Sequence, residues 1–380
     1  MVPKRGLRLG RIFGIEVYVH WTWLIVFSLL LWATITFFRD NGKADSFFMI
    51  PTAVLTTLLF FASVLAHEVS HSLVANRNDV PIGRITLFVF GGVAQMSRDV
   101  DTPRTELKMA AAGPMASYLL AICFGSLAYL ADTLGMGTLN LGLIWLALVN
   151  VGLGTFNLMP GFPLDGGRIL RSIIWHHTGD LERATRLASR AGMGLGILLA
   201  AGGASLLAAD PLVPGSSLMV PGVWFVLIGV FLYSAASSGY RQARMRSRTA
   251  GLQVGGFFRP GVPAVDVSTS LEEVFRLHFA QNPRAAVPVL RQGRLYGVIY
   301  YFMMAKIPRG RLQDLPAESV ARQVKASETA RPAESLYSAL MRMEKGRLPF
   351  LWVVEDGRLL GVLLLRDLQG LVNGVPAAPS

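Results

Sequence analysis

Six long apolar segments are the feature of this 380-residue chain that most restricts its fold. A helix needs about twenty mostly apolar residues to cross the hydrocarbon core of a bilayer. With 52% hydrophobic and only 16% charged residues, the chain is also more apolar than an ordinary soluble domain. We therefore predict an α-helical polytopic membrane protein embedded in a lipid bilayer, with six transmembrane helices near residues 21–38, 50–75, 107–131, 139–158, 191–209 and 218–239.

The positive charges between these segments predict how the helices are oriented. Lysine and arginine are enriched in the loops that stay on the cytoplasmic side. Basic clusters precede the first segment, separate the second from the third and the fourth from the fifth, and follow the sixth, whereas the other three loops hold only Arg39 and Lys43. This alternation predicts a multi-pass protein of the plasma or inner membrane with both termini in the cytoplasm. It also accounts for the net charge of +12 without a nucleic-acid partner.

Two shorter regions of the membrane part carry other signals. Residues 1–20 lack the pattern of a cleaved signal peptide, so we expect a cytoplasmic leader into the first span. Residues 84–96, RITLFVFGGVAQM, alternate in polarity and contain a glycine pair, which predicts a strand and a turn. This short β element is too apolar for a free loop. It should lie at the membrane boundary, where protein or a cavity covers its backbone.

After Arg248 the composition becomes that of a soluble α/β region with an internal repeat. Residues 287–307 and 351–371 share the order strand, turn and strand, with a common Gly-Arg-Leu and a common Gly-Val, and each follows a predicted helix. The expected divisions of the chain are 1–248 for the membrane domain, 249–256 for a linker, 257–310 for the first repeat, and 311–380 for the second repeat and the tail.

The second apolar segment contains the sequence HEVSH, residues 67–71. An ionisable group within a bilayer is costly, so such a group requires a functional explanation. His67 and His71 share one face of a helix and can ligate one zinc ion, with Glu68 beside it as a candidate general base. Histidines on apolar faces are more commonly packed core residues, but this alternative leaves Glu68 without an evident basic partner in the span.

A catalytic zinc ion usually has three protein ligands, so a third ligand is expected. The strongest candidate is Asp165, in the sequence FNLMPGFPLDGGR that follows the fourth segment. Pro160 and Pro163 should break the helix, and Gly166–Gly167 should let the chain turn sharply, so that the carboxylate can bend back into the bundle. The alternative is a loop aspartate near Arg168.

Three motifs together resemble the site-2 protease family of intramembrane zinc metalloproteases: HEVSH in the second span, AAAGPMAS in the third and NLMPGFPLDGG after the fourth. The C-terminal repeat resembles a tandem pair of CBS domains, and VYVHWTW and GGVAQ resemble the CBS-containing branch of the family. The resemblance covers nearly the whole chain. It implies a metalloendopeptidase with one Zn²⁺ per chain, held by His67, His71 and Asp165, in which Glu68 activates the metal-bound water.

The resemblance also implies a substrate class and a further site residue. Asn157 matches a family asparagine thought to help hold the substrate carbonyl, and as an amide donor it can stabilise an oxyanion. Its alternative role is to cap the broken end of the fourth span. The substrates are expected to be single-span membrane proteins, such as a tethered transcription regulator, an anti-sigma factor or a pro-sigma factor. An unwound substrate segment is expected to pair with the strand in residues 84–96.

The CBS pair departs from the family's nucleotide-binding pattern. That pattern ends its last strand with Thr or Ser, followed three residues later by an Asp that contacts ribose. The second repeat keeps Asp367 but has Leu364 in place of the hydroxyl, and the first has Tyr300 and Met303 at the two positions. Asp367 is thus the one candidate contact for an adenine nucleotide, and a structural pair that forms a homodimer is the alternative.

Two other classes of function remain open from the sequence. A transporter or channel regulated by CBS domains would also contain buried polar residues, but here these residues converge on one ligand set and do not line a pore. A catalytically inactive scaffold that binds substrates is disfavoured, because Glu68 and all three proposed ligands are present. The leading expectation is an intramembrane zinc endopeptidase that acts in regulated intramembrane proteolysis.

Overall fold

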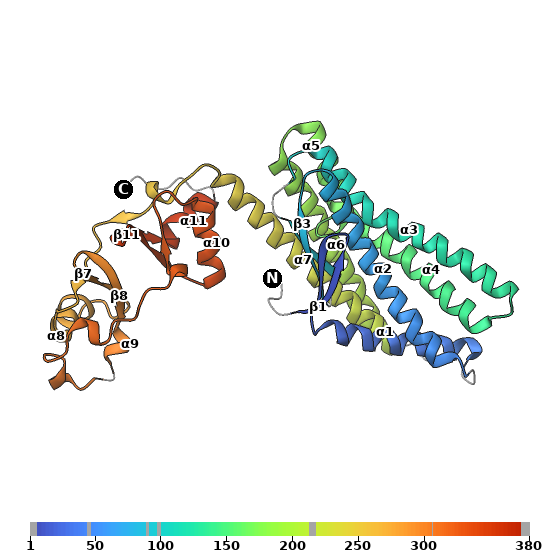
Figure 1. The fold of residues 1–380 in the computed structure, drawn as a ribbon, viewed down its shortest axis with the longest axis horizontal. Coiled ribbons are helices and arrows are strands. Elements are labelled where there is room, and N and C mark those ends of the chain that lie inside the picture. Colours follow the sequence, from blue (N-terminus) through green and yellow to red (C-terminus); the bar gives the residue numbers. More distant parts are fainter. Residues whose placement is uncertain are drawn as a thin grey trace. The chain divides into compact units, whose positions relative to one another are not determined.

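The computed structural model describes residues 6–43, 47–88, 91–96, 100–212, 218–305 and 307–373. The chain forms two compact units, Met1–Arg241 and Gln242–Ser380. Within the described residues, six helices are long and apolar enough to cross a membrane, which confirms the predicted six-span architecture. They are α1 (Trp23–Phe38), α2 (Met49–Arg77), α3 (Pro103–Thr133), α4 (Gly137–Asn157), α6 (Leu181–Ala209) and α7 (Met219–Arg248) (Figure 1).

The region between the fourth and fifth spans contains an additional helix that we did not predict. This helix, α5 (Asp165–Thr178), ends at Gly179, whose φ of 68° places it in the left-handed region typical of a helix end. Helix α6 then begins at Leu181 and not near residue 191, because Asp180 caps it: the Asp180 carboxylate accepts a hydrogen bond of 2.8 Å from the backbone N–H of Arg183.

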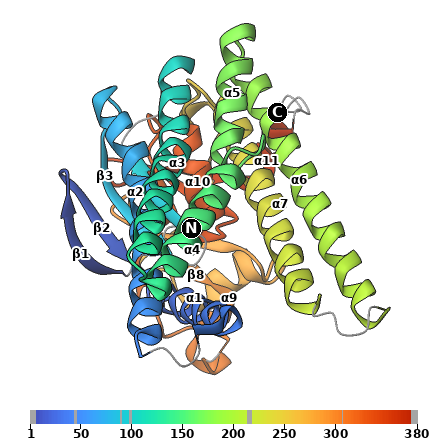
Figure 2. The ribbon, with the colours of Figure 1, turned by 90° about the vertical axis from the view of Figure 1, so that its right-hand side faces the viewer.

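A four-stranded sheet accompanies α2 in the first unit (Figure 2). Its strands, in spatial order, are β1 (Leu7–Ile12), β2 (Ile15–Val19), β3 (Ile82–Phe88) and β4 (Gly91–Met96). The predicted strand is confirmed as β3, but the glycine pair expected in the turn, Gly91–Gly92, lies at the start of a second strand, β4. The two residues between these strands lie outside the described residues. The leader expected for residues 1–20 was too simple a description, because much of it folds into the hairpin β1–β2. Its alternation, visible in IEVYV, is a strand signal that we missed. Ile15, Ile85 and Leu87 bury one face of the sheet against Val69 of α2.

The helices approach one another most closely where glycines remove side chains. The segment that joins α4 to α5 lies against α6, and the backbone N–H of Phe162 donates a hydrogen bond of 3.2 Å to the carbonyl of Ala188. A Cβ atom on Gly192 of α6 would overlap the carbonyl oxygen of Phe162. Gly196 and Gly203 of α6 meet Gly229 and Gly222 of α7 in the same manner. The loop that carries Asp165 is therefore held by backbone contacts on its α6 side.

The second unit is built from two copies of a β-hairpin flanked by helices. Its sheet has the order β6 (Val265–Asp266), β7 (Ala286–Arg291), β8 (Arg294–Tyr300), β11 (Arg358–Leu364), β10 (Phe350–Glu355) and β9 (Thr329–Ala330), and β5 (Arg259–Pro260) pairs with β11. The helices are α8 (Leu271–Val274), α9 (Tyr301–Met304), α10 (Leu336–Gly346) and α11 (Leu365–Asn373). This arrangement confirms the predicted repeat. The finer boundaries at 248, 256 and 310 stay predictions, and the tail beyond residue 373 lies outside the described residues.

Both hairpins of the repeat turn through a residue pair with positive φ. These pairs are Gln292–Gly293, with φ of 51° and 77°, and Asp356–Gly357, with φ of 49° and 84°. Such two-residue turns match the right-handed twist of the strands they join. The two halves have separate cores. Leu271, Val289 and Ile299 belong to one of them, and Leu340, Val353 and Leu363 belong to the other.

We predict that Gly192→Ala destabilises the protein, because the added methyl group must push the Phe162 backbone away from α6. Overpacking of this kind typically costs about 1–3 kcal/mol of unfolding free energy. The thermal unfolding midpoint of the detergent-solubilised full chain measures the effect. Gly194→Ala is the matched control, since nothing lies within 4 Å of the added atom on the same helix. Equal midpoints for the two variants would contradict the tight contact.

Candidate metal centre

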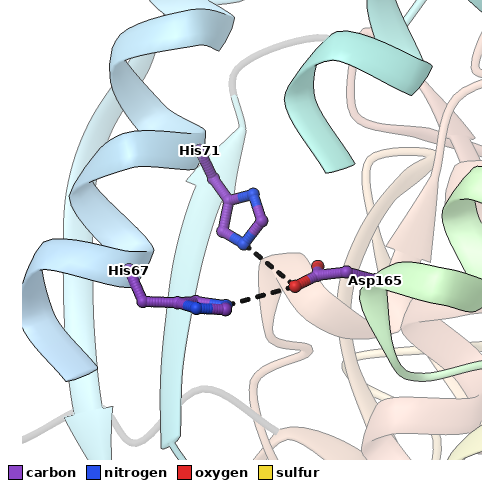
Figure 3. A group of neighbouring side chains, drawn as sticks. All are labelled: His67, His71 and Asp165. Carbon is purple, nitrogen blue, oxygen red and sulfur yellow. Dashed lines mark hydrogen bonds and ion pairs between the residues drawn. The ribbon is translucent and has the colours of Figure 1, made fainter. Parts of the chain in front are cut away.

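Three side chains from two helices converge inside the first unit (Figure 3). His67 and His71 lie on one face of α2, and Asp165 is the first residue of α5. The Oδ2 atom of Asp165 lies 3.1 Å from Nε2 of His67 and 3.2 Å from Nε2 of His71. All three residues are buried. The structure thus brings together the three ligands that we predicted, although their sequence positions are nearly one hundred residues apart.

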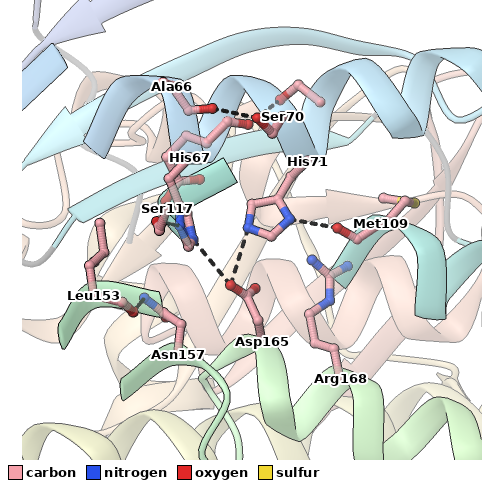
Figure 4. A network of polar contacts seen from close by, with 12 residues as sticks. Ala66, His67, Ser70, His71, Met109, Ser117, Leu153, Asn157, Asp165 and Arg168 are labelled. Carbon is pink, nitrogen blue, oxygen red and sulfur yellow. Dashed lines mark hydrogen bonds and ion pairs between the residues drawn. The ribbon is translucent and has the colours of Figure 1, made fainter. Parts of the chain in front are cut away.

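In each histidine, the hydrogen bond made by Nδ1 bears on whether Nε2 of the same ring can act as an acceptor. Nδ1 of His71 lies 2.6 Å from the carbonyl oxygen of Met109, and this oxygen can only accept, so Nδ1 carries the proton (Figure 4). Nε2 of a neutral His71 is then an acceptor that faces the carboxylate of Asp165. Nδ1 of His67 forms a 2.9 Å hydrogen bond with the hydroxyl of Ser117. Two imidazoles held from behind in this way are typical of metal sites.

This set of atoms fits a zinc ion. The Asp165 carboxylate and Nε2 of His71 are both acceptors, and they lie close together away from solvent. Such an arrangement is costly unless a cation, either a proton or a metal ion, lies between them. Ligands about 2.1 Å from a tetrahedral zinc ion lie about 3.4 Å from one another, close to the separations found here. Burial raises the pKa of Asp165, but the adjacent imidazoles of His67 and His71 outweigh burial and lower that pKa to about 2. The third candidate ligand is therefore a carboxylate at neutral pH.

The glycine pair after Asp165 acts differently from our expectation. We expected Gly166–Gly167 to turn the chain, but both residues lie in the first turn of α5. A Cβ atom on Gly166 would overlap the carbonyl of Leu158, and one on Gly167 would overlap the backbone of Gly161. The two glycines therefore let the preceding loop lie directly on the helix, and this close packing places Asp165 opposite α2. The turn itself is made by the residues between α4 and α5.

A buried ion pair that we did not predict fixes α5 to α3. Glu106 of α3 is fully buried, and Arg171 of α5 donates to both of its carboxylate oxygens. Nε of Arg168 lies 3.9 Å from the same carboxylate. We had counted both arginines among the basic residues between the fourth and fifth spans, and had otherwise named Arg168 only as a loop neighbour of Asp165. The signal available in the sequence was an acid at the start of a span, together with two arginines spaced three residues apart just after Asp165.

One face of α3 provides all of these supporting contacts. Glu106, Met109, Gly113 and Ser117 recur every three or four residues and so lie on one side of the helix. A Cβ atom on Gly113 would overlap Nε2 of His71 and lie 2.6 Å from Nε2 of His67. Gly113 therefore leaves room beside both candidate ligand atoms. The motif AAAGPMAS contains this residue, but only the packed structure explains why it must be glycine.

Glu68 lies beside the three candidate ligands, on the same turn of α2 as His67. Its carboxyl group is within electrostatic range of His67, His71 and Asp165, and the backbone N–H of Gly92 donates a hydrogen bond to it. A Cβ atom on Gly92 would overlap Cγ of Glu68. Strand β4 is thus pressed against the candidate general base, a contact that needs a glycine in the strand.

The remaining predicted residues take different surroundings. Asn157 is the last residue of α4, and its amide donates a 3.0 Å hydrogen bond to the carbonyl of Leu153 (Figure 4). In the second unit, Asp367 forms a two-point ion pair with Arg259 of β5, at 2.7 and 2.9 Å. A cleft of about 550 Å³ lies near the start of α11 and is lined in part by Arg284, Phe350 and Arg366.

Comparison with known proteins gives two family matches. The model of peptidase family M50 matches residues 55–133 and 126–199, and the model of the CBS domain matches residues 254–306 and 320–374. A zinc-metalloprotease relative named Rip3, from Mycobacterium tuberculosis, is 30% identical over 376 residues, which cover 97% of this chain and 93% of Rip3. Zinc metalloprotease MJ0392 from Methanocaldococcus jannaschii is 28% identical over 96% of this chain and 95% of its own.

A solved structure is also similar in part. The site-2 protease from Methanocaldococcus jannaschii is 29% identical, with a TM-score of 0.41, over 62% of this chain and 95% of that one.

We predict that Gly113→Ala weakens zinc binding by at least about tenfold, because the methyl group occupies the space beside both Nε2 atoms. Competition with a chromophoric chelator measures the affinity in the purified full chain. Gly125→Ala, on the same helix with nothing within 4 Å of the new atom, serves as the control and should bind zinc as the unsubstituted protein does. Undiminished affinity in Gly113→Ala would place the metal elsewhere.

Proposed function

The chain belongs to peptidase family M50, and from this premise we propose that it is an intramembrane zinc endopeptidase that cleaves the transmembrane segments of single-span membrane proteins. It is a multi-pass membrane protein with a tandem pair of CBS domains. The observation that carries the proposal is the meeting of His67, His71 and Asp165 within a bundle of apolar helices, with Glu68 beside them. This arrangement is suited to hydrolysis of a peptide bond.

Each residue of the site has a role in the proposed reaction. His67, His71 and Asp165 would hold the zinc ion, which would polarise the scissile carbonyl and make water a stronger acid. Glu68 accepts a proton from the attacking water and can pass it to the leaving amine. One N–H of the Asn157 amide is donated to Leu153, and we assign the other to the oxyanion that forms on the substrate. Ser117 and Met109 hold the imidazoles in place.

The sheet supports a way to present the substrate. A helix hides its peptide carbonyls in hydrogen bonds, so a transmembrane substrate must unwind before it is cut. Within the described sheet, β4 is an edge strand, and its residue Gly92 lies against Glu68. An extended substrate segment added to β4 would therefore pass beside the general base. By family resemblance we propose membrane-tethered transcription regulators as substrates, at the plasma membrane, with both termini of the protease in the cytoplasm.

We predict that Glu68→Gln keeps its zinc and loses cleavage of a co-expressed substrate by at least about 100-fold, because general acid–base catalysis is removed while the ligands remain. Zinc content by mass spectrometry and cleavage by immunoblot are the two measurements. The same inactive variant should capture an uncleaved substrate that carries a photo-crosslinker, with contacts to β4.

Glu272→Gln, an exposed position in the second unit, is the control and should cleave normally. If cells that express Glu68→Gln cleaved the substrate as fully as cells that express the unsubstituted protein, the peptidase proposal would be contradicted. Solute flux that is insensitive to Glu68→Gln would instead indicate a transporter. Substrate capture by the unsubstituted protein without any cleavage would indicate a scaffold.

The nucleotide contact at Asp367 is a separate proposal. Both carboxylate oxygens of Asp367 are occupied by Arg259, so a ribose has to displace the guanidinium before it can bind there. Because the hydroxyl that the family pattern expects is replaced by Leu364, we propose only weak binding of an adenine nucleotide. A mainly structural role of the pair, including formation of a homodimer, is the competing proposal.

We predict that Arg259→Ala binds AMP, ADP or ATP more tightly than the unsubstituted protein, because it frees the carboxylate of Asp367. Isothermal titration calorimetry of the full chain in detergent measures the three affinities. Arg276→Ala, an exposed arginine of the first repeat, is the matched control. If neither the unsubstituted protein nor Arg259→Ala released or absorbed heat with any of the three nucleotides, the structural role of the CBS pair would be favoured.

A further inference from the structure

A hollow of about 860 Å³ lies on the β1–β2–β3 side of the first unit, away from the candidate metal centre. Strand β2 leads within a few residues into α1, and the hollow includes the first residues of that helix. The candidate span begins at Trp23, so this side of the protein lies where the chain enters the bilayer. Neither the peptidase site nor the CBS pair uses this hollow.

The polar residues that line the hollow include hydrogen-bond donors and no acid. The guanidinium of Arg84 lies 4.2 Å from the centre of the Tyr18 ring, and the Arg84 side chain is 44% exposed. Its nearest carboxylate, Glu16, is 3.9 Å away, does not line the hollow, and is shared with Arg8 at 3.2 Å. His20 engages Thr22 through Nδ1 at 2.9 Å, which leaves its Nε2 without a protein partner among the described residues.

The other residues that line the hollow are mainly apolar. Leu7, Trp21 and Leu24 line it and are 73%, 65% and 60% exposed. Trp23 lines it as well, and its buried Nε1 has no hydrogen-bond partner within the described part of the chain. Tryptophan is enriched at membrane–water interfaces. The hollow therefore combines cationic and donor groups with apolar side chains, as an amphiphile with an anionic head would require.

The charge around the hollow agrees with such a ligand. Strands β1, β2 and β3 carry three arginines, Arg8, Arg11 and Arg84, against the single acid Glu16. Basic residues at the surface of a membrane attract the negative lipids of the cytoplasmic leaflet. We propose that this hollow binds one anionic phospholipid of the surrounding bilayer. Arg84 and His20 contact the headgroup phosphate, and Trp21 and Leu24 contact an acyl chain.

The test measures lipid binding and does not depend on the proposed peptidase activity. Native mass spectrometry of the detergent-solubilised full chain, titrated with phosphatidylglycerol or phosphatidylcholine, gives both affinities. The unsubstituted protein should prefer phosphatidylglycerol. Arg84→Gln should weaken phosphatidylglycerol binding by about fivefold, the effect of one basic residue at an anionic membrane surface. Its binding of phosphatidylcholine should change little.

Two further variants make the result specific. Arg11→Gln removes the same charge from the same four-stranded sheet, but Arg11 does not line the hollow and its Nε donates to the carbonyl of Gly14. The affinity of this variant should therefore stay within about twofold of the unsubstituted protein. Trp21→Ala should weaken binding of both lipids. Because Trp21 is 65% exposed, its loss should leave the thermal unfolding midpoint unchanged.

Three outcomes would overturn the proposal. Equal affinity of the unsubstituted protein for the two lipids would show that the headgroup charge is not recognised. Equal losses in Arg84→Gln and Arg11→Gln would show only a diffuse electrostatic attraction of the lipid to the basic sheet. A photo-crosslinker at Trp21 that captures a substrate segment and no lipid would assign the hollow to the substrate.

Discussion

The meeting of one carboxylate with two imidazoles is the constraint on which the first unit depends. Oδ2 of Asp165 lies 3.1 and 3.2 Å from the Nε2 atoms of His67 and His71, all in a buried place. Acceptors held this close repel one another unless a cation joins them. Folding must therefore bring α2 and α5 together against a local electrostatic penalty, and the surrounding contacts offset it.

Helix α3 supplies most of those contacts. Its Glu106 holds α5 through Arg171, while Met109 and Ser117 hold the two imidazoles from behind. Gly113 lies between these supports and leaves space beside the candidate ligand atoms. A single helix face thus fixes both the helix that carries the histidines and the helix that carries the aspartate. In a bilayer, where helix association has little hydrophobic driving force, such polar and close-packed contacts are the available means.

The four-stranded sheet contributes both to the candidate metal centre and to the hollow beside α1. Its inner face packs on α2 through Ile15, Ile85 and Leu87, which keeps β4 against Glu68. The hollow on β2 and β3 lies where the chain enters the bilayer. The same sheet therefore places an edge strand beside the candidate catalytic residue and lines the hollow for which we propose a lipid. In the second unit, Arg259 of β5 similarly reaches a distant partner, Asp367.

The sequence by itself determined the features that depend on local pattern. Apolar length predicted six spans, the i, i+4 spacing placed His67 and His71 on one helix face, and the repeated hairpins predicted the two halves of the soluble region. The motifs also led us to expect Asp165 beside the two histidines, but only the tertiary structure decided the other contacts between distant residues. Glu106 pairs with Arg171, residues near the N-terminus form a hairpin beside β3, and Gly166–Gly167 serves packing and not a turn. A periodic pattern reports which face of an element is buried, whereas pairing across the chain depends on how the backbones pack.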